Sequence, residues 1–157
     1  MDIRRATIED ADAVRAIYCH PEMAAMFFDG SIGPEQIEWR KVLRNTAAYY
    51  IIVSQNGEDL GLFLFYPMNL VTFELHVSFL PCHRGGIVRE AALLAKEYMF
   101  TETPCRKVVA YVPAYNRSAR VMAHMCGMKQ EGINRKSFLK DGDLTDQYAM
   151  GFCKEVA

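Results

Sequence analysis

Residues 73–100, FELHVSFLPCHRGGIVREAALLAKEYMF, constrain the fold most, because they predict a strand, a glycine-bearing loop and a long helix in direct succession. Arg84, Gly85 and Gly86 lie at the junction of loop and helix. Main-chain N–H groups at the start of a helix lack intrahelical acceptors, and the helix dipole favours negative charge there. The junction therefore predicts an anion site of phosphate size. A plain turn that needs glycine for its geometry is the alternative.

The remaining chain predicts further strands and helices on both sides of this segment. Strands are expected at residues 3–6, 49–55, 60–66, 71–80, 108–112, 129–139 and 144–152. Helices are expected after Thr7, from Pro21, at residues 34–45, up to Phe100 and at residues 117–126. Asn56-Gly57 and residues 140–143 predict hairpin turns. No repeat or linker interrupts the chain. This pattern indicates one α/β (α+β) domain over residues 1–157, mostly antiparallel at its ends with a crossover in the middle.

Composition and charge limit the class of protein. The chain has 157 residues, 51% of them apolar and 24% charged, which suits one soluble globular domain. The net charge of −1 gives no general attraction to nucleic acid or to an anionic membrane. Five cysteines without a C-x-x-C pair indicate reduced thiols, and no Cys/His spacing predicts a metal site. No stretch approaches the roughly 20 apolar residues of a membrane span, so a cytoplasmic location is expected.

Glu74 and His76 are the candidates for acid–base chemistry. Side chains alternate along a strand, so residues two apart share one face of the sheet. A carboxylate and an imidazole on one face, beside a ligand cleft, can act as a general base and its partner. An exposed sheet face can hold the same pair without any catalytic role.

The helix expected at residues 117–126 has an apolar face and a basic face. Its apolar positions recur with helical spacing and are expected in the core: Ala119, Met122, Ala123 and Cys126. Arg120 lies on another face and is a ligand candidate if the phosphates of a cofactor pass this helix. A solvated basic stripe is the alternative interpretation.

The order of these elements resembles the GNAT superfamily of acyl-CoA-dependent N-acyltransferases over essentially the whole chain. The motifs that carry the resemblance are E-x-H, the R-G loop, T-P, V-P-x-x-N-R-x-A and D-G-D, and their combination resembles small GNAT-like proteins of bacteriophages. The resemblance implies a mixed, mostly antiparallel, twisted sheet of about six to seven strands flanked by about four helices. It also implies a V-shaped splay between the fourth and fifth strands, here residues 73–80 and 108–112.

The resemblance implies acetyl-CoA as the acyl donor and no metal. In the family, the pyrophosphate lies on a loop of the form Q/R-x-x-G-x-G/A, which residues 83–88 match with His83 and Val88 as departures. The implied cofactor-binding residues are Phe79, Leu80, Arg84, Gly85, Gly86, Ile87, Val88, Arg89, Asn116 and Arg120. Main-chain groups near Phe79 and Leu80 would hold the pantetheine arm in the splay. Val88, where a small residue is usual, could crowd the phosphate.

The resemblance further implies transfer of an acetyl group to a primary amine by direct attack, with Glu74 or His76 as the catalytic base. Many members carry a tyrosine acid where this chain has Ala123. The acid would then be Tyr115 or Tyr148, or the thiolate leaves unaided. The acceptor, a small molecule or a peptide, stays open, and the N-terminal third of the chain is its expected wall. A non-catalytic CoA-binding or structural protein, such as a virion component, is the alternative. A monomer or a homodimer is expected.

Overall fold

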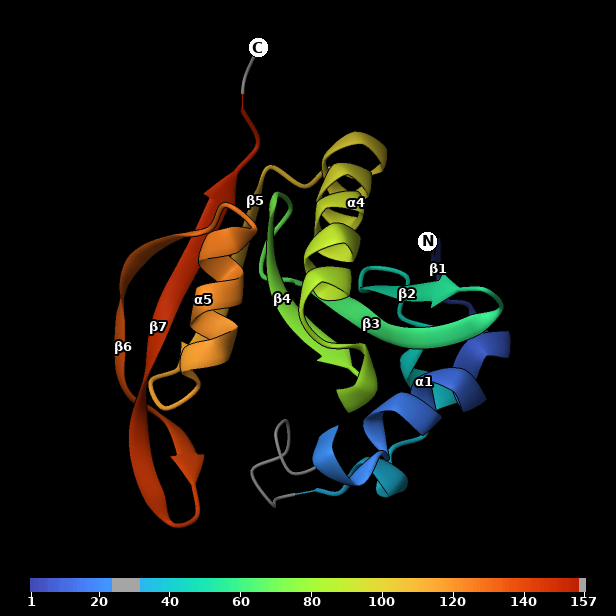
Figure 1. Ribbon diagram of the computed structural model, residues 1–157, viewed down its shortest axis with the longest axis horizontal. Helices are drawn as coiled ribbons and strands as arrows, with labels where there is room; N and C mark the ends of the chain where they lie inside the picture. The colour runs from blue at the N-terminus through green and yellow to red at the C-terminus, as the bar shows by residue number, and fades with distance from the viewer. Residues whose placement is uncertain (24–31, 156–157) are drawn as a thin grey trace.

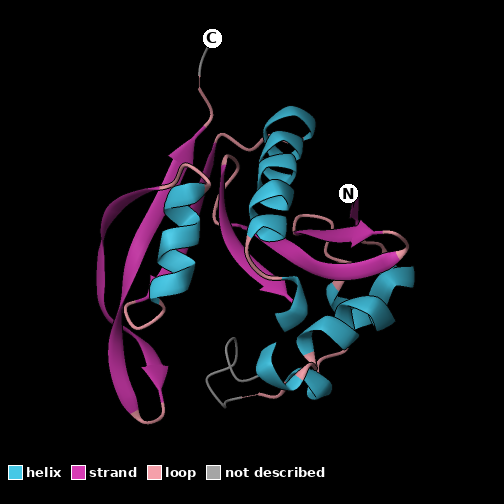
Figure 2. Cartoon of the chain, in the orientation of Figure 1, coloured by secondary structure: helices cyan, strands magenta, loops and turns pink. Residues whose placement is uncertain are grey.

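The computed structural model describes residues 1–23 and 32–155, which form one seven-stranded sheet with helices on both faces (Figure 1, Figure 2). The strands are β1 (Asp2–Arg5), β2 (Tyr49–Gln55), β3 (Glu58–Pro67), β4 (Thr72–Phe79), β5 (Lys107–Pro113), β6 (Lys129–Lys140) and β7 (Asp143–Cys153). The helices are α1 (Ala11–Tyr18), α3 (Trp39–Val42), α4 (Gly86–Glu102) and α5 (Arg117–Met125). Three short 3-10 turns, η1 (Ile8–Asp10), η2 (Pro34–Gln36) and η3 (Pro81–His83), connect them.

The sheet is mixed and splayed, as the resemblance implied. Its strand order is β1-β2-β3-β4-β5-β7-β6, and neighbours are antiparallel apart from β4 and β5, which are parallel and joined by the crossover helix α4. The β4–β5 pairing ends after three residue pairs, the last of which joins Glu74 to Val109. Beyond it, β4 turns away from β5 (Figure 1). The expected V-shaped splay between the fourth and fifth strands is thereby confirmed.

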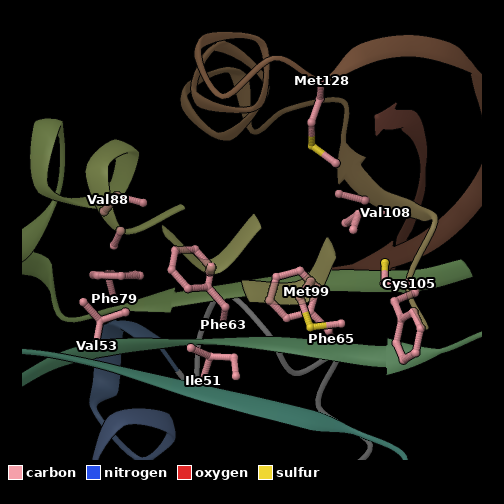
Figure 3. Close-up of a cluster of buried hydrophobic side chains, with 14 of the residues drawn as sticks. Ile51, Val53, Phe63, Phe65, Phe79, Val88, Met99, Cys105, Val108 and Met128 are labelled. Carbon is pink, nitrogen blue, oxygen red and sulfur yellow. The ribbon is translucent and has the colours of Figure 1, made fainter. Parts of the chain in front are cut away.

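Apolar clusters cover both faces of the sheet. α4 and α5 pack on one face, where Phe63, Phe79 and Val88 belong to a single core (Figure 3). α1 and α3 pack on the opposite face, around Tyr18 and Trp39. Helical spacing predicts an apolar side of α4 made of Val88, Ala91, Ala92, Ala95 and Met99, and all of these are buried except Ala92, which is half-buried. The sheet is therefore a central layer with a different helix pair on each side.

Several expected caps and turns are confirmed. Thr7 and Asp10 form a capping box at the start of η1. Asn56-Gly57 joins β2 to β3 with φ of 54° and 80°, and the second hairpin turn has positive φ at residues 141 and 142. These values suit the tight two-residue turns of a right-twisted hairpin. Gly127, expected to end α5, has φ of 90°.

The helix expected at residues 34–45 is wrong as a single element. Pro34 begins a helical turn, as its position predicted, but η2 ends at Gln36, and the next residue, Ile37, has an extended ψ of 128°. α3 then begins at Trp39 and spans four residues. The Trp39 ring donates from Nε1 to the Pro34 carbonyl at 3.1 Å and stacks on Tyr18. Tertiary packing of one large side chain thus breaks a segment that is locally suited to a helix.

The apolar face of α5 is also less buried than expected. Ala119, Met122 and Ala123 contact the core, but no residue of α5 is buried. Of the helical piece expected at residues 21–28, residues 21–23 are helical and residues 24–28 lie outside the described part of the chain. All five cysteines are free thiols. None of the described helices is long and apolar enough to cross a membrane.

Candidate functional site

The main-chain groups of β4 alternate between its two neighbours. The N–H of Leu80 donates to the carbonyl of Leu60 at 3.0 Å, and the β3–β4 register is unbroken from there to the start of the strand, so even-numbered residues of β4 bond to β3. The carbonyl of Val71, in the odd-numbered set, accepts from Lys107 at 3.0 Å on the β5 side. Odd-numbered residues of β4 therefore present their N–H groups toward β5.

Two of these N–H groups face the opening instead of a strand. Val77 and Phe79 lie beyond Glu74, where the pairing with β5 ends. An extended ligand in the opening can pair with such groups in the way that an added strand does. Val77 was not among the expected site residues. The signal that points to it is the period-two alternation of a strand, counted back from Phe79.

Leu80 lies where it was expected, at the end of β4, but its main chain is already paired. Its N–H donates to Leu60, and its carbonyl accepts from the N–H of His83 at 2.9 Å. A main-chain donor for a ligand in the opening is therefore provided by Phe79 and Val77 rather than by Leu80. Sequence alone does not reveal this, because the pairing depends on the register with β3.

Residues 84–87, where the loop after β4 passes into the first turn of α4, are termed here the glycine loop. Gly85 has φ of 90°, which side-chain-bearing residues rarely adopt, and its carbonyl accepts from the N–H of Val88 at 3.1 Å. Among the described residues, no acceptor lies on the N–H groups of Gly86 and Ile87. A Cβ added at Gly86 would meet nothing within 4 Å. An anionic group thus has both donors and open space at the start of α4.

The side chains beside the glycine loop have distinct surroundings. Arg84 lies 3.4 Å from Glu22, and both side chains are exposed, so a cation stands at the loop. Arg89 donates from Nε to the carbonyl of Met125 at 3.3 Å and thereby joins α4 to the end of α5. The side chain of Val88 is buried in the core (Figure 3). Its methyl groups therefore point into the core, so they leave the space in front of the loop uncrowded.

Asn116 and Arg120 belong to the beginning of α5, the helix that follows β5. The Oδ1 of Asn116 accepts from the N–H of Ala119 at 3.1 Å, which caps the helix. Within the described part of the chain, the amide NH2 of Asn116 has no acceptor, so it is available to a ligand. The Arg120 guanidinium lies over the ring of Tyr148, 4.4 Å from its centroid.

Glu74 and His76 lie together on the face of the sheet opposite α4. The His76 Nε2 is 3.4 Å from the Glu74 Oε1, and both side chains are half-buried. Burial lowers the pKa of His76, and the Glu74 carboxylate opposes this shift in part. The imidazole is therefore neutral near pH 7 and able to accept a proton. His76 is also the first residue of this face beyond the last β4–β5 pair, so it borders the opening.

A cavity of about 260 Å³ adjoins His76 on the same face. Its remaining described lining residues come from α1, α3, the residue between η2 and α3, and the neighbouring strands: Tyr18, Ile37, Trp39, Val42, Tyr50 and Leu64. This cavity is termed here the aromatic cavity. The N-terminal third was expected to wall an acceptor site, and Trp39 of that segment lies here. Four further large apolar residues of that segment were expected at the same wall: Met23 is buried but does not line the aromatic cavity, and Met26, Phe27 and Phe28 lie outside the described residues.

The two tyrosines considered as acids differ in setting. Tyr115 lies in the turn before α5 with 52% of its surface exposed, and its partial burial together with the nearby Asp141 raises its pKa, so it stays protonated. Tyr148 lies half-buried on β7 beneath Arg120. Ala123, at the position where many GNAT proteins have the tyrosine, packs against the core of the α4 face. Within residues 1–23 and 32–155, no three metal-ligating side chains gather.

A comparison with protein-family models matches residues 1–129 to a model described as an acetyltransferase (GNAT) domain. The chain belongs to the GNAT acetyltransferase family. The matched residues of this GNAT protein contain β4, the glycine loop, α4, β5 and α5. Family membership supports acyl transfer as the general reaction class. Membership of a bacteriophage subfamily stays a prediction.

Solved structures share the fold of this GNAT protein along nearly its whole length. A spermidine N-acetyltransferase from Vibrio cholerae, in complex with CoA and spermine, is 20% identical, covers 97% of this chain and 94% of that chain, and has a TM-score of 0.82. A GNAT-family acetyltransferase from Bacillus anthracis is 20% identical, covers 96% of this chain and 93% of that chain, and has a TM-score of 0.76. These structures establish the fold. No curated protein matches the sequence significantly.

Proposed function

We propose that this protein transfers the acetyl group of acetyl-CoA to a primary amine. The observation that carries the proposal is the opening between β4 and β5, because three chemical features meet around it. The N–H groups of Val77 and Phe79, which pair with no described strand, face it, the glycine loop follows the end of β4, and the Glu74–His76 pair borders it. A thioester cofactor needs the first two features, and an attacking amine needs the third.

Each part of the cofactor has a matching set of groups. The pyrophosphate lies against the N–H groups of Gly86 and Ile87, with Arg84 as the nearby cation. The pantetheine arm runs along β4 and pairs with one of the two N–H groups of Val77 and Phe79, which leaves the other for the acetyl carbonyl oxygen. The amide NH2 of Asn116 and the guanidinium of Arg120 approach from the α5 side.

The chemical step needs one base and one set of main-chain donors. His76, neutral because burial lowers its pKa, takes the proton from the acceptor nitrogen. The nitrogen forms a bond to the acetyl carbonyl carbon, the carbon–sulfur bond breaks, and the sulfur leaves as a thiolate. Glu74, 3.4 Å from His76, stabilises the imidazolium that forms. The N–H of Phe79 or Val77 stabilises the charge on the carbonyl oxygen.

The thiolate is a tolerable leaving group, since the pKa of an alkyl thiol is about 8.5. Ala123 cannot protonate it, so Tyr115 or Tyr148 returns the proton or the thiolate departs into water. This loss of the usual acid favours a second candidate function, a CoA-binding protein without catalysis. The glycine loop and the β4 donors would serve that function without Glu74 and His76.

The test combines binding with turnover. Acetyl-CoA at 100 times its Kd should stabilise the protein by about 2.7 kcal/mol in thermal unfolding. Thiol release with a panel of primary amines should then fall roughly 10²–10⁴-fold in His76→Ala, with the thermal shift retained. His124→Ala, at an exposed histidine of α5, is the matched control. A thermal shift without thiol release from any amine would favour the non-catalytic protein, and absence of any shift would refute both.

A further inference from the structure

We infer that the acceptor amine carries an apolar group, an aromatic ring or a branched alkyl chain, which fills the aromatic cavity while its nitrogen lies at His76. This inference rests on the proposed acetyltransferase function and names the class of its acceptor. The juxtaposition that carries it is a cavity that ends on the proposed base and whose described lining residues include no ionised side chain.

The lining of the aromatic cavity is apolar or aromatic throughout, apart from the imidazole of His76. Among the residues that the structure describes, seven line the cavity, and none of them is Asp, Glu, Lys or Arg. Tyr18 and Trp39 stack with ring centroids 4.8 Å apart and an angle of 7° between their planes. Burial raises the pKa of both Tyr18 and Tyr50, so both phenols are neutral. The cavity therefore offers ring faces and edges to a ligand, without a counter-ion.

This lining disfavours an acceptor with several positive charges along its length. An ammonium group that leaves water needs a carboxylate or an equivalent set of acceptors, and an unpaired buried charge is strongly unfavourable. Glu74 is outside the lining and 3.4 Å from His76, so it can pair with one ammonium at the entrance before that nitrogen loses its proton. An acceptor with one ammonium at the entrance and an apolar group inside therefore suits both Glu74 and the lining of the aromatic cavity.

The size of the cavity limits the apolar group. A dry cavity of about 150 Å³ accommodates benzene, and pockets for drug-sized ligands begin near 300 Å³. The aromatic cavity, at about 260 Å³, lies between these values. It suits one substituted ring or a short branched alkyl chain. Sites of this kind discriminate between acceptors by roughly 10–200-fold for each apolar group gained or lost.

The protein contains a direct probe of occupancy. Trp39 is its single tryptophan, and it lines the cavity. Phenethylamine should therefore change the intrinsic fluorescence in a saturable way, in the presence of CoA. Ethanolamine and spermidine at the same concentration should not. In thiol-release assays, kcat/KM for phenethylamine should exceed that for ethanolamine by at least about tenfold.

A cavity-filling variant makes the test specific. Val42→Phe places a ring in the cavity from α3, while Leu70→Phe, at a residue with 88% exposure in the β3–β4 turn, adds the same ring elsewhere. Val42→Phe should lose at least about tenfold in kcat/KM for phenethylamine and less than about twofold for ethanolamine. Leu70→Phe should match the unmodified protein with both amines, and retained thermal shifts with CoA show that both variants fold.

The outcomes separate the two proposals. Saturable quenching by phenethylamine without thiol release from any amine would support the cavity as an apolar site and contradict the acetyltransferase function. Thiol release with a preference for spermidine or ethanolamine would support acetyl transfer and overturn the apolar acceptor. Equal losses with both amines in Val42→Phe would likewise overturn it, because the cavity would then have no role in selecting the acceptor.

Discussion

Burial and the Glu74 carboxylate have opposite effects on the pKa of His76. Burial lowers the pKa of His76 from its usual 6.5, and the carboxylate opposes that shift. Because the neutral imidazole is the proposed base, kcat/KM should fall on the acid side of a pKa below 6.5, by about tenfold per pH unit. Glu74→Gln removes the charge that raises the pKa of His76. The acid limb should therefore move to still lower pH in this variant.

The pH profile of kcat/KM, measured with a panel of primary amines, checks this prediction. Glu97→Gln, which removes a carboxylate from the solvated side of α4, should leave the position of the limb unchanged. A limb that moves to higher pH in Glu74→Gln would contradict the assignment of His76 as the base.

Gly61 is the residue that lets β3 approach β4 closely. A Cβ at this position would lie 2.4 Å from the carbonyl oxygen of Ser78 and 2.6 Å from the Cα of Phe79. Gly61→Ala should therefore lower the free energy of unfolding by about 1–3 kcal/mol, because backbone atoms must move. Gly132→Ala on β6, where a Cβ meets nothing within 4 Å, is the matched control. Urea denaturation measures both, and equal stability of the two variants would refute the close contact.

At the scale of the element, the alternation along β4 has a measurable consequence. The N–H groups of Val77 and Phe79 face the opening, whereas that of Leu80 is bonded to β3. Amide hydrogen exchange of Val77 and Phe79 should be faster than that of Ser78 and Leu80 in the free protein. Acetyl-CoA should slow exchange at Val77 and Phe79 selectively. Uniform protection along the strand, without ligand, would show that the opening is closed in solution.

Elements that depend on short-range sequence could be predicted. The bounds of β2, both hairpin turns and the C-terminal glycine of α5 follow from β-branched runs, Asn-Gly and Asp-Gly pairs, and helix-ending signals. The break at Ile37 could not, because it depends on Trp39 packing against Tyr18 from another helix. The half-buried α5 was also missed, since its spacing alone does not show how much sheet lies beneath it.

The residues of the candidate site likewise fall into those that short-range sequence predicts and those that depend on the folded chain. The shared face of Glu74 and His76 and the helix start at Gly86 are local properties, and the sequence pointed to both. The paired state of Leu80 and the availability of Val77 are set by the register with β3. The aromatic cavity collects Tyr18, Trp39 and other residues from elements distant in the sequence. Only the folded chain brings these together.

At the scale of the whole molecule, the sheet consists of two halves with a short junction. β1 to β4 form one antiparallel half, β5, β7 and β6 form the other, and three residue pairs join them. α4 and α5 pack on one face, and α1 and α3 on the other. The proposed cofactor site lies on the side of the glycine loop, and the proposed acceptor site lies on the opposite face. The two substrates would thus enter from opposite sides and meet where the halves part.

The short junction between β4 and β5 gives the sheet two interior edges in addition to its outer ones. Exposed strand edges are a liability in solution, because they pair with strands of other molecules. Here the unpaired edge of β4 begins only beyond Glu74, between layers of helices on both faces. An extended ligand that enters the opening can pair with this edge as an added strand would. The helix layers thus shield from other chains an edge that stays open to such a ligand.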